Sequence, residues 1–456
     1  MNMIFIGIIV FICFLQVFTL GLAGKPHQQV ILENTLAKEY LAHPKVLNLT
    51  KAYRKHLLQL ASLFSLLSLS FVFISYESIQ LTFFWLLLFA SLTAMYLCQI
   101  YYIRKMKQLI NENQWQLAIQ PKRVDTTLIL NKNRKMVPVY WLYLAYLLGL
   151  PFSWYAWKTT DLLTAGILLG SHTLILLLML VNYHYVGRIP MKSLTNNQKI
   201  NQEYNDLTKH SWSFMTVCLS WLMLPLLFLP IWLSETTGLY AMILTIIYSS
   251  LLLFLIFFTI AYLYSLRKKQ DQLLMQTEEY RYTGDDEYWR YGVYINPDDP
   301  KLFVPDRIGM NIGINLGRAV GKVLMAGTAL LLAATFILTL VPAYIYDFTE
   351  NPLQLEQVGQ NVVLSAPFTN TITIPLVEVE TVELINELPT PITKSFGTAT
   401  DNYAIGRFNV ASRKAYLFID HRSQPILKIQ TKKIDYYYTN KIPEKTIERY
   451  NILTLP

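Results

Sequence analysis

One stretch divides the chain into parts of different character. It begins with Asp285-Asp-Glu-Tyr-Trp-Arg-Tyr-Gly292 and continues through Asn296-Pro-Asp-Asp-Pro300 and Phe303-Val-Pro-Asp-Arg307. Four glycines follow, and then a last apolar run ends near Tyr346. The sequence before this stretch consists largely of long apolar runs, whereas the sequence after it alternates as strands do. We therefore expect a helical membrane region, a polar connecting segment and a β-rich domain.

The composition indicates a polytopic membrane protein. The chain has 456 residues, of which 53% are hydrophobic and 15% are charged, whereas about 25% charged residues are usual in soluble domains. A membrane-spanning helix needs roughly 20 predominantly apolar residues. Runs of that kind predict eight spans, at residues 3–22, 57–75, 81–103, 139–157, 162–186, 213–233, 239–264 and 322–345.

The basic residues predict an orientation for these spans. Every second connection is rich in Lys and Arg, with six in 23–56, eight in 104–138, four in 187–212 and eight in 265–321. The three remaining connections contain only Lys158. Because Lys and Arg collect on the cytoplasmic side, both termini are expected outside the cell. The net charge of +9 then follows from topology, and we expect no nucleic-acid partner.

Two connections carry further expectations. Residues 23–56 are amphipathic and predict helices near Ile31–Ala42 and Pro44–Lys55, which either lie along the membrane surface or pack on the bundle. Residues 116–130 suggest a short hairpin. No Lys or Arg precedes the run at 3–22, so we expect it to be a retained helix and not a cleaved signal peptide.

Few residues in the apolar runs could perform chemistry. His172 is the best candidate, although a lone histidine in a bundle is more often a packing residue. The prolines Pro151, Pro225 and Pro230 could mark a substrate path or simple kinks. The cysteines are Cys13, Cys98 and Cys218, all in apolar runs, so no disulfide framework is expected. With no catalytic or nucleotide-binding motif in view, we expect no enzyme activity, no cofactor and no metal.

The polar stretch supplies the other candidate functional residues. Its aspartates could hold a metal, but their spacing does not match a calcium loop, and Asn296-Pro-Asp-Asp-Pro300 favours a turn. Alternating residues on either side suggest a β-hairpin that pairs 291–295 with 302–304. The candidate functional residues here are Trp289, Asn296, Asp298, Asp299 and Arg307.

The glycines recur at intervals of four, at Gly309, Gly313, Gly317 and Gly321. On a helix they would form one stripe of small residues, which would allow a second helix to pack closely. An extended segment is the alternative, because 308–316 also alternates in part. We favour the helix from Asn315 onward and assign the glycines to packing.

The residues of this stretch resemble a known domain. The run from Trp289 through Tyr294-Ile-Asn-Pro-Asp-Asp-Pro300 to Arg307 and Asn315 is similar to a short domain of unknown function in membrane proteins of Gram-positive bacteria. The segment Glu39-Tyr, His43-Pro and Tyr53-Arg54 resembles the first cytoplasmic segment of the same proteins. More distantly, these proteins resemble the membrane family that includes the immunity protein for the sporulation-delaying toxin. The resemblance implies no catalytic residues.

Residues 350–456 predict an exported domain. Strands are expected near 362–364, 371–382, 403–408, 415–419 and 425–429, and a final helix near 443–453. The run Gly406-Arg-Phe408, Pro425-Ile-Leu-Lys-Ile429 and Tyr436–Tyr438 resembles the bacterial pleckstrin-homology-like family. The resemblance implies a barrel closed by one helix, which acts as a binding or assembly module.

Together these expectations define four parts: 1–264, seven helices with basic loops; 265–321, a cytoplasmic turn-rich segment; 322–346, the last span; and 350–456, the exported domain. We expect a non-enzymatic protein of the bacterial cell membrane that senses or resists membrane-active peptides. Its expected partners are the lipid bilayer, a peptide or envelope protein, and a cytoplasmic regulator. A transporter, a scaffold and, less favoured, an enzyme acting on lipid-linked substrates are the alternatives.

Overall fold

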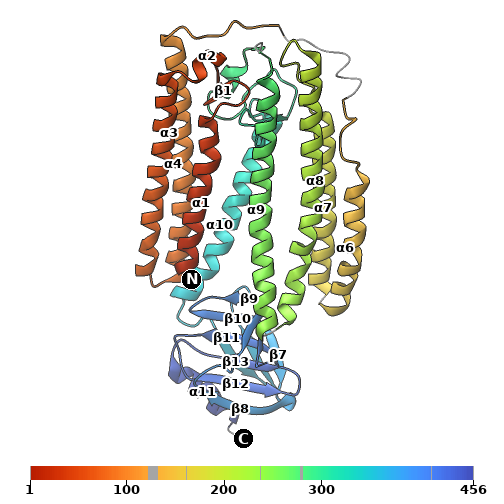
Figure 1. The fold of residues 1–456 in the computed structure, drawn as a ribbon. Coiled ribbons are helices and arrows are strands. Elements are labelled where there is room, and N and C mark those ends of the chain that lie inside the picture. Colours follow the sequence, from red (N-terminus) through yellow and green to blue (C-terminus); the bar gives the residue numbers. More distant parts are fainter. Residues whose placement is uncertain are drawn as a thin grey trace.

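The chain forms a bundle of long helices with a β-rich domain at one end (Figure 1). The computed structural model describes residues 2–121, 132–160, 162–236, 238–277, 281–411 and 413–454. Eight helices of 20 residues or more occur in these ranges. They are α1 (Asn2–Gly21), α3 (Pro44–Ser68), α4 (Glu77–Glu112), α6 (Tyr140–Thr159), α7 (Leu162–Arg188), α8 (Gln198–Glu235), α9 (Gly238–Leu274) and α10 (Ala319–Phe348).

Seven helices in the described part of the chain are long and apolar enough to cross a membrane. They are all of the long helices except α6. Two of these spans include short 3₁₀ turns, η1 (Leu22–Gly24) after α1 and η2 (Leu69–Phe73) after α3. Every predicted apolar run is therefore helical, and seven of the eight have the length and composition of a membrane span.

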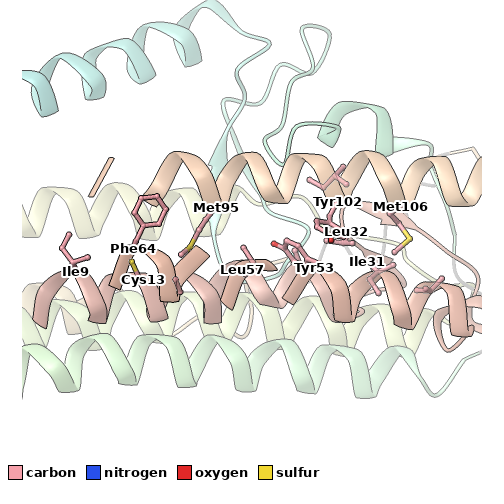
Figure 2. Packing of buried hydrophobic residues seen from close by; sticks show 14 of the residues in the cluster. Ile9, Cys13, Ile31, Leu32, Tyr53, Leu57, Phe64, Met95, Tyr102 and Met106 are labelled. Atoms are coloured by element: carbon pink, nitrogen blue, oxygen red, sulfur yellow. The ribbon is translucent and has the colours of Figure 1, made fainter. Parts of the chain in front are cut away.

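The helices α1, α3 and α4 share one apolar core (Figure 2). The buried positions of α3 recur every three or four residues, so they lie on one face of that helix. Figure 2 shows Leu57 and Phe64 from this face beside Cys13 of α1 and Met95 of α4. Toward the other end of the cluster, the rings of Tyr53 and Tyr102 lie 5.3 Å apart.

A group of short elements covers the end of the bundle opposite the β-rich domain (Figure 1). We call this region the polar cap and define it as residues 25–36, 189–197 and 281–318. It contains β1 (Val30–Ile31), β2 (Asn34–Thr35), η3 (Asp285–Trp289), β3 (Phe303–Pro305) and β4 (Ile312–Ile314), next to the short helix α2 (Lys38–Leu41).

Several expectations for the loops are wrong. Residues 31–42 are not one helix, because β1 and β2 form a tight antiparallel pair there. Residues 44–55 are helical, but they are the first turns of α3 and not a separate helix along the surface. The predicted hairpin of 291–295 with 302–304 is also wrong, since β3 pairs with β4. The hairpin suggested over 116–130 extends beyond the described residues.

The glycines do not form one helical stripe: of the four, only Gly321 lies in the helix expected from Asn315 onward, and the extended alternative holds at Gly313. Helix α10 begins only at Ala319, and Gly313 lies in strand β4. The segment is extended because β4 hydrogen-bonds to β3 and the following turn is held by side chains. The glycines still permit close packing: a Cβ on Gly317 would lie 2.4 Å from the carbonyl carbon of Asn296. Gly309 has a φ of +81°, a conformation that favours glycine.

The C-terminal domain consists of two sheets and one helix. The first sheet has the order β5-β6-β7, and the second has the order β8-β12-β13-β11-β10-β9, in which β11 and β13 run parallel. The strands are β5 (Gln354–Val358), β6 (Asn361–Ser365), β7 (Ile372–Pro375), β8 (Val379–Ile385), β9 (Ile392–Ala399), β10 (Tyr403–Val410), β11 (Arg413–Asp420), β12 (Ile426–Thr431) and β13 (Asp435–Tyr438).

The two sheets enclose an apolar core. Leu355, Val362 and Leu364 of the first sheet pack with Ile405 and Leu427 of the second, and all five are at most 2% exposed. The turn η4 (Leu376–Glu378) joins β7 to β8. The predicted final helix is confirmed as α11 (Pro443–Thr454). The predicted strands are confirmed in position, except that 371–382 is split by η4 and that β5, β9 and β13 had no predicted counterpart.

Candidate functional site

The buried amide of Asn315 holds the polar cap together. Its Oδ1 accepts hydrogen bonds from the backbone N–H groups of Asn296, at 3.0 Å, and Gly317, at 2.9 Å. Its Nδ2 donates to the carbonyl oxygens of Asn296, Asp299 and Lys301. The residue is 0% exposed. This one side chain therefore hydrogen-bonds backbone N–H and C=O groups before β3 and after β4. Those groups lie outside helices and strands and need such partners.

The segment around Asn296 is a turn, as predicted. The Oδ1 of Asn296 accepts from the N–H of Asp298 at 3.0 Å, and the Oδ1 of Asp299 accepts from the N–H of Lys301 at 3.0 Å. These bonds mimic backbone turns and fit Asn and Asp. The hydroxyl of Tyr294 donates to Asp299 and accepts from the Asn296 amide. Of the candidate functional residues, Asn296, Asp298 and Asp299 thus shape the turn.

Arg307 connects this turn region to the N-terminal hairpin. Its guanidinium lies 2.7 Å from Asp286 and donates to the carbonyl oxygen of Glu33 at 2.9 Å. It also donates to the hydroxyl of Thr35, which in turn donates to Asp286. Charge-assisted bonds of this kind are stronger than neutral ones. The side chain of Arg307 therefore fastens residues that are more than 270 positions apart in the sequence.

The carboxyl group of Glu33, close to these Arg307 contacts, is buried. Glu33 is 3% exposed, and its Oε2 has no hydrogen-bond partner among the described residues. Burial raises the pKa of Glu33 to about 8, although the nearby Arg307 lowers it. Glu33 is therefore largely protonated at neutral pH, because its carboxylate would be poorly solvated.

Asp306 and His27 each make further polar contacts in this part of the chain. The carboxylate of Asp306 accepts from the N–H groups of Gly309, at 2.7 Å, and Met310, at 3.0 Å. Burial raises its pKa to about 6, although these bonds lower it. The Nδ1 of His27 lies 2.8 Å from Asp271. Burial lowers the pKa of His27, against the opposing effect of Asp271, so we expect a neutral ring with its proton on Nδ1.

The structure brings three of the candidate residues to one cavity of about 300 Å³ in the polar cap. Trp289, Asp299 and Arg307 contribute to its lining. Trp289 is only 4% exposed, and its ring packs 5.2 Å from that of Tyr294. Asn296 and Asp298 lie in the adjoining turn, outside the lining.

His172 lies far from the polar cap, within the apolar part of α7. It is 2% exposed, and its Nδ1 is 3.3 Å from the hydroxyl of Ser153. The rings of Tyr146 and Phe228 pack against it, with centroids at 4.5 Å and 5.5 Å. Gly149 makes room for the imidazole, since a Cβ there would lie 2.3 Å from it. These contacts describe a tightly packed histidine.

Polar contacts join the C-terminal domain to helices α4 and α10. We call this region the junction and define it by the residues Glu77, Ser78, Asp347, Asn402, Tyr403, Arg422 and Lys441. The carboxylate of Asp347, near the end of α10, accepts from the N–H of Ser78 at 2.8 Å. Glu77 accepts from the N–H of Asn402 at 2.7 Å. Acidic groups are favourable at a helix N-terminus, and Glu77 is the first residue of α4. Each carboxylate thus links one helix to another part of the chain.

Aromatic and basic residues of the domain complete the junction. The hydroxyl of Tyr403 donates to the carbonyl oxygen of Tyr346 at 2.6 Å, and their rings lie 5.5 Å apart. Arg422 binds Asp420 at 2.7 Å and lies 4.0 Å from Asp347. Lys441 donates to the carbonyl oxygens of Asp347 and Thr349, which the end of α10 leaves without helical partners.

The comparisons with known proteins identify the C-terminal domain. Residues 354–452 match the family described as Bacterial PH domain. No curated protein and no solved structure matches the chain. The resemblance of the C-terminal region to pleckstrin-homology-like domains is therefore confirmed. We refer to it below as the PH-like domain, attached to a region of apolar helices of spanning length.

Patterns in the sequence do not single out Glu33 and His27, whose side chains are 3% and 1% exposed in the cap. One signal was available, because Glu33 and Asn34 interrupt the apolar residues Val30, Ile31 and Leu32 and thus suggest a tight turn. Their burial depends on contacts with 267–310 that no local pattern encodes.

Proposed function

We propose that the chain is a non-enzymatic integral membrane protein of the cell envelope that senses membrane-active peptides, or gives resistance to them, through its PH-like domain. The junction is the observation that carries the proposal. Glu77 and Tyr403 join the domain directly to α4 and α10, and Asp347 joins these two helices to each other. A ligand that displaces the domain would therefore also strain the helices.

The edge of the larger sheet supports a peptide as the ligand. Strand β9 is the last strand of its sheet, and within the described residues only β10 pairs with it. An extended peptide can add a strand to such an edge. Phe396 on β9 is 70% exposed and Ile392 is 38% exposed, so the edge offers apolar side chains as well as backbone groups.

The proposed orientation places the PH-like domain outside the cell. The N-terminal end of α1 and the domain lie at the same end of the bundle (Figure 1). The basic connections 23–56 and 265–321 meet at the opposite end, where the polar cap lies. With Lys and Arg on the cytoplasmic side, the cap would face the cytoplasm, where a regulator could bind it.

Survival of bacteria that produce the protein, challenged with a panel of cationic and hydrophobic antimicrobial peptides, tests the proposal. We expect protection against one peptide class, and we expect deletion of 350–456 to abolish it without preventing membrane insertion. Phe396→Ser should reduce protection several-fold, whereas the matched change Val377→Ser, at a position 91% exposed on η4, should not. Protection that survives the deletion, or no protection across the panel, would contradict the proposal and favour a scaffold.

A transporter is a second candidate, and one observation favours it. The Nε2 atom of His172 is buried without a hydrogen-bond partner among the described residues, within a helix of spanning length. A buried ionisable group of this kind is often functional. Replacing His172 with Asn should then reduce uptake or efflux of a substrate found by metabolite profiling. Unchanged transport in that variant would count against this candidate.

A further inference from the structure

The cavity in the polar cap has the chemistry of an anion site. Its volume is about 300 Å³, which is near the lower end of the range for ligand pockets. Four basic side chains contribute to its lining, against two carboxylates. The basic residues are Lys192, Arg281, Lys301 and Arg307, and the carboxylates are Asp285 and Asp299.

The charges of the lining are partly balanced: Asp285 and Asp299 lie in it, and Arg307 is paired with Asp286 at 2.7 Å, so about one positive charge remains. Asp299 accepts from the Tyr294 hydroxyl and from the N–H of Lys301, and Asp285 accepts from the Thr283 hydroxyl at 2.8 Å. Arg281 is held by the Asn196 amide and by the carbonyl oxygen of Pro121. These bonds fix the walls of the cavity before any ligand enters.

Among the described residues, Lys192 is one cation of the lining whose side chain is available to a ligand. Its backbone is fixed, since its N–H donates to the Asn205 side chain at 2.8 Å. Its ammonium group has no hydrogen bond or ion pair among the described residues. Burial lowers the pKa of Lys192 and the nearby Arg307 lowers it further, whereas Asp285 and Asp306 raise it. An anion in the cavity would add further counter-charge beside the ammonium group.

A second, mostly apolar hollow continues from this cavity along the end of α7. Its volume is about 400 Å³, and it shares Ile189, Pro190 and Lys301 with the polar cavity. Val181 of α7 and Phe303 of β3 line it and are 66% and 36% exposed. The combined hollow is therefore polar at one end and apolar at the other.

We propose that these two hollows form one binding site for a membrane lipid with a phosphate headgroup. The phosphate would lie in the cavity against Lys192 and Lys301, and an acyl chain would lie in the apolar hollow beside Val181 and Phe303. A soluble phosphate ester shares the headgroup chemistry, but it would leave the apolar hollow empty. The position of that hollow on α7, a helix of spanning length, gives a lipid lateral access from the bilayer.

Binding to the full-length protein in detergent micelles tests the site, with native mass spectrometry as the measurement. The probes are dioleoyl phosphatidic acid, dioleoylglycerol with the same chains but no phosphate, and glycerol 3-phosphate with no chains. We expect retention of phosphatidic acid at least tenfold above dioleoylglycerol. Equal retention of the two lipids, or equally strong competition by glycerol 3-phosphate, would overturn the proposal.

Variants separate the two ends of the site. Lys192→Gln should weaken phosphatidic acid binding about tenfold, as expected for the loss of a charge-assisted hydrogen bond, and Lys301→Gln should weaken it less, since Lys301 is exposed. Lys51→Gln, on the exposed surface of α3, is the matched control and should have no effect.

Val181→Asn should weaken binding of phosphatidic acid while leaving the response to glycerol 3-phosphate unchanged, because it alters only the apolar hollow. Thermal unfolding of each variant without lipid provides the folding control. If Lys192→Gln does not fold, phosphatidic acid binding to the Lys301→Gln and Val181→Asn variants still tests the proposal. Wild-type binding in both of these folded variants would overturn the proposal.

Discussion

The polar cap and the PH-like domain fix non-helical backbone in different ways. In the domain, long strands satisfy one another, and the sheets enclose apolar residues such as Leu364 and Leu427. In the cap, the strand pairs span only two or three residues, so polar side chains such as the buried Asn315 and the partly buried Asp306 bond the backbone instead. A short irregular segment therefore needs specific polar residues to bond its backbone, whereas a sheet mainly needs an apolar pattern.

The largest expected effect comes from Asn315→Ala in the cap. The change leaves two N–H groups and three carbonyl oxygens without their partner, so we expect a loss of about 4 kcal/mol of stability, since each unsatisfied buried group costs roughly 1–3 kcal/mol. Tryptophan fluorescence during thermal unfolding measures it. The exposed Asn311 is the control, and Asn311→Ala should cost less than about 1 kcal/mol. Equal melting of the two variants would break the comparison.

Leu364→Ala tests the apolar core of the PH-like domain. Leu364 is 0% exposed, and we expect a loss of about 3 kcal/mol, typical of a cavity left in a core. Hydrogen exchange should rise in β6 and its neighbouring strands while the amides of the polar cap stay protected. Val358→Ala on β5, where the side chain is 58% exposed, is the control. Faster exchange in the cap would show that the two regions unfold together.

Glu33→Gln should stabilise the cap at high pH. The pKa of Glu33 is raised from 4.5 to about 8 in the folded protein, so the folded state binds a proton more tightly than the unfolded state. Stability then falls as the pH rises between these two values and is constant above them. The Glu33→Gln variant has no carboxyl group at this position, so this loss of stability with rising pH is absent from it.

We therefore expect the Glu33→Gln variant to exceed the wild type by about 4 kcal/mol near pH 9 and to match it near pH 4. Melting temperatures at both pH values measure the difference. Glu203→Gln, on an exposed part of α8, controls for the loss of one surface charge. A stabilisation that is the same at both pH values would contradict the raised pKa of the buried Glu33 carboxyl group.

The smallest effect is expected at the surface of the PH-like domain. Lys428 and Glu383 lie 3.7 Å apart on neighbouring strands, and the Glu383 side chain is 52% exposed. Exposed ion pairs contribute about 0–1 kcal/mol, so Glu383→Gln should change stability by less than about 0.5 kcal/mol. Chemical denaturation measures this change. A larger loss would show that polar contacts matter in the domain as they do in the cap.

The sequence alone determined the positions of the helices, the turn at Asn296, most strands of the PH-like domain and its final helix. These features follow from local patterns: apolar runs of spanning length, turn-forming side chains and alternation in strands. It also indicated Trp289, Asp299 and Arg307, which the fold brings to one cavity.

Only the tertiary structure decided which distant groups meet. Arg307 reaches Glu33, and Asp347 reaches Ser78, across 274 and 269 positions of sequence. Gly313 is in a strand and not in a helix, because β4 finds a partner in β3, and Gly309 lies in a bend with a φ of +81°. Local propensity is weak compared with such bonds when the groups are shielded from water. The burial of Glu33 and the position of Lys192 at the cavity, and with them the chemistry of the polar cap, therefore emerge only in the folded chain.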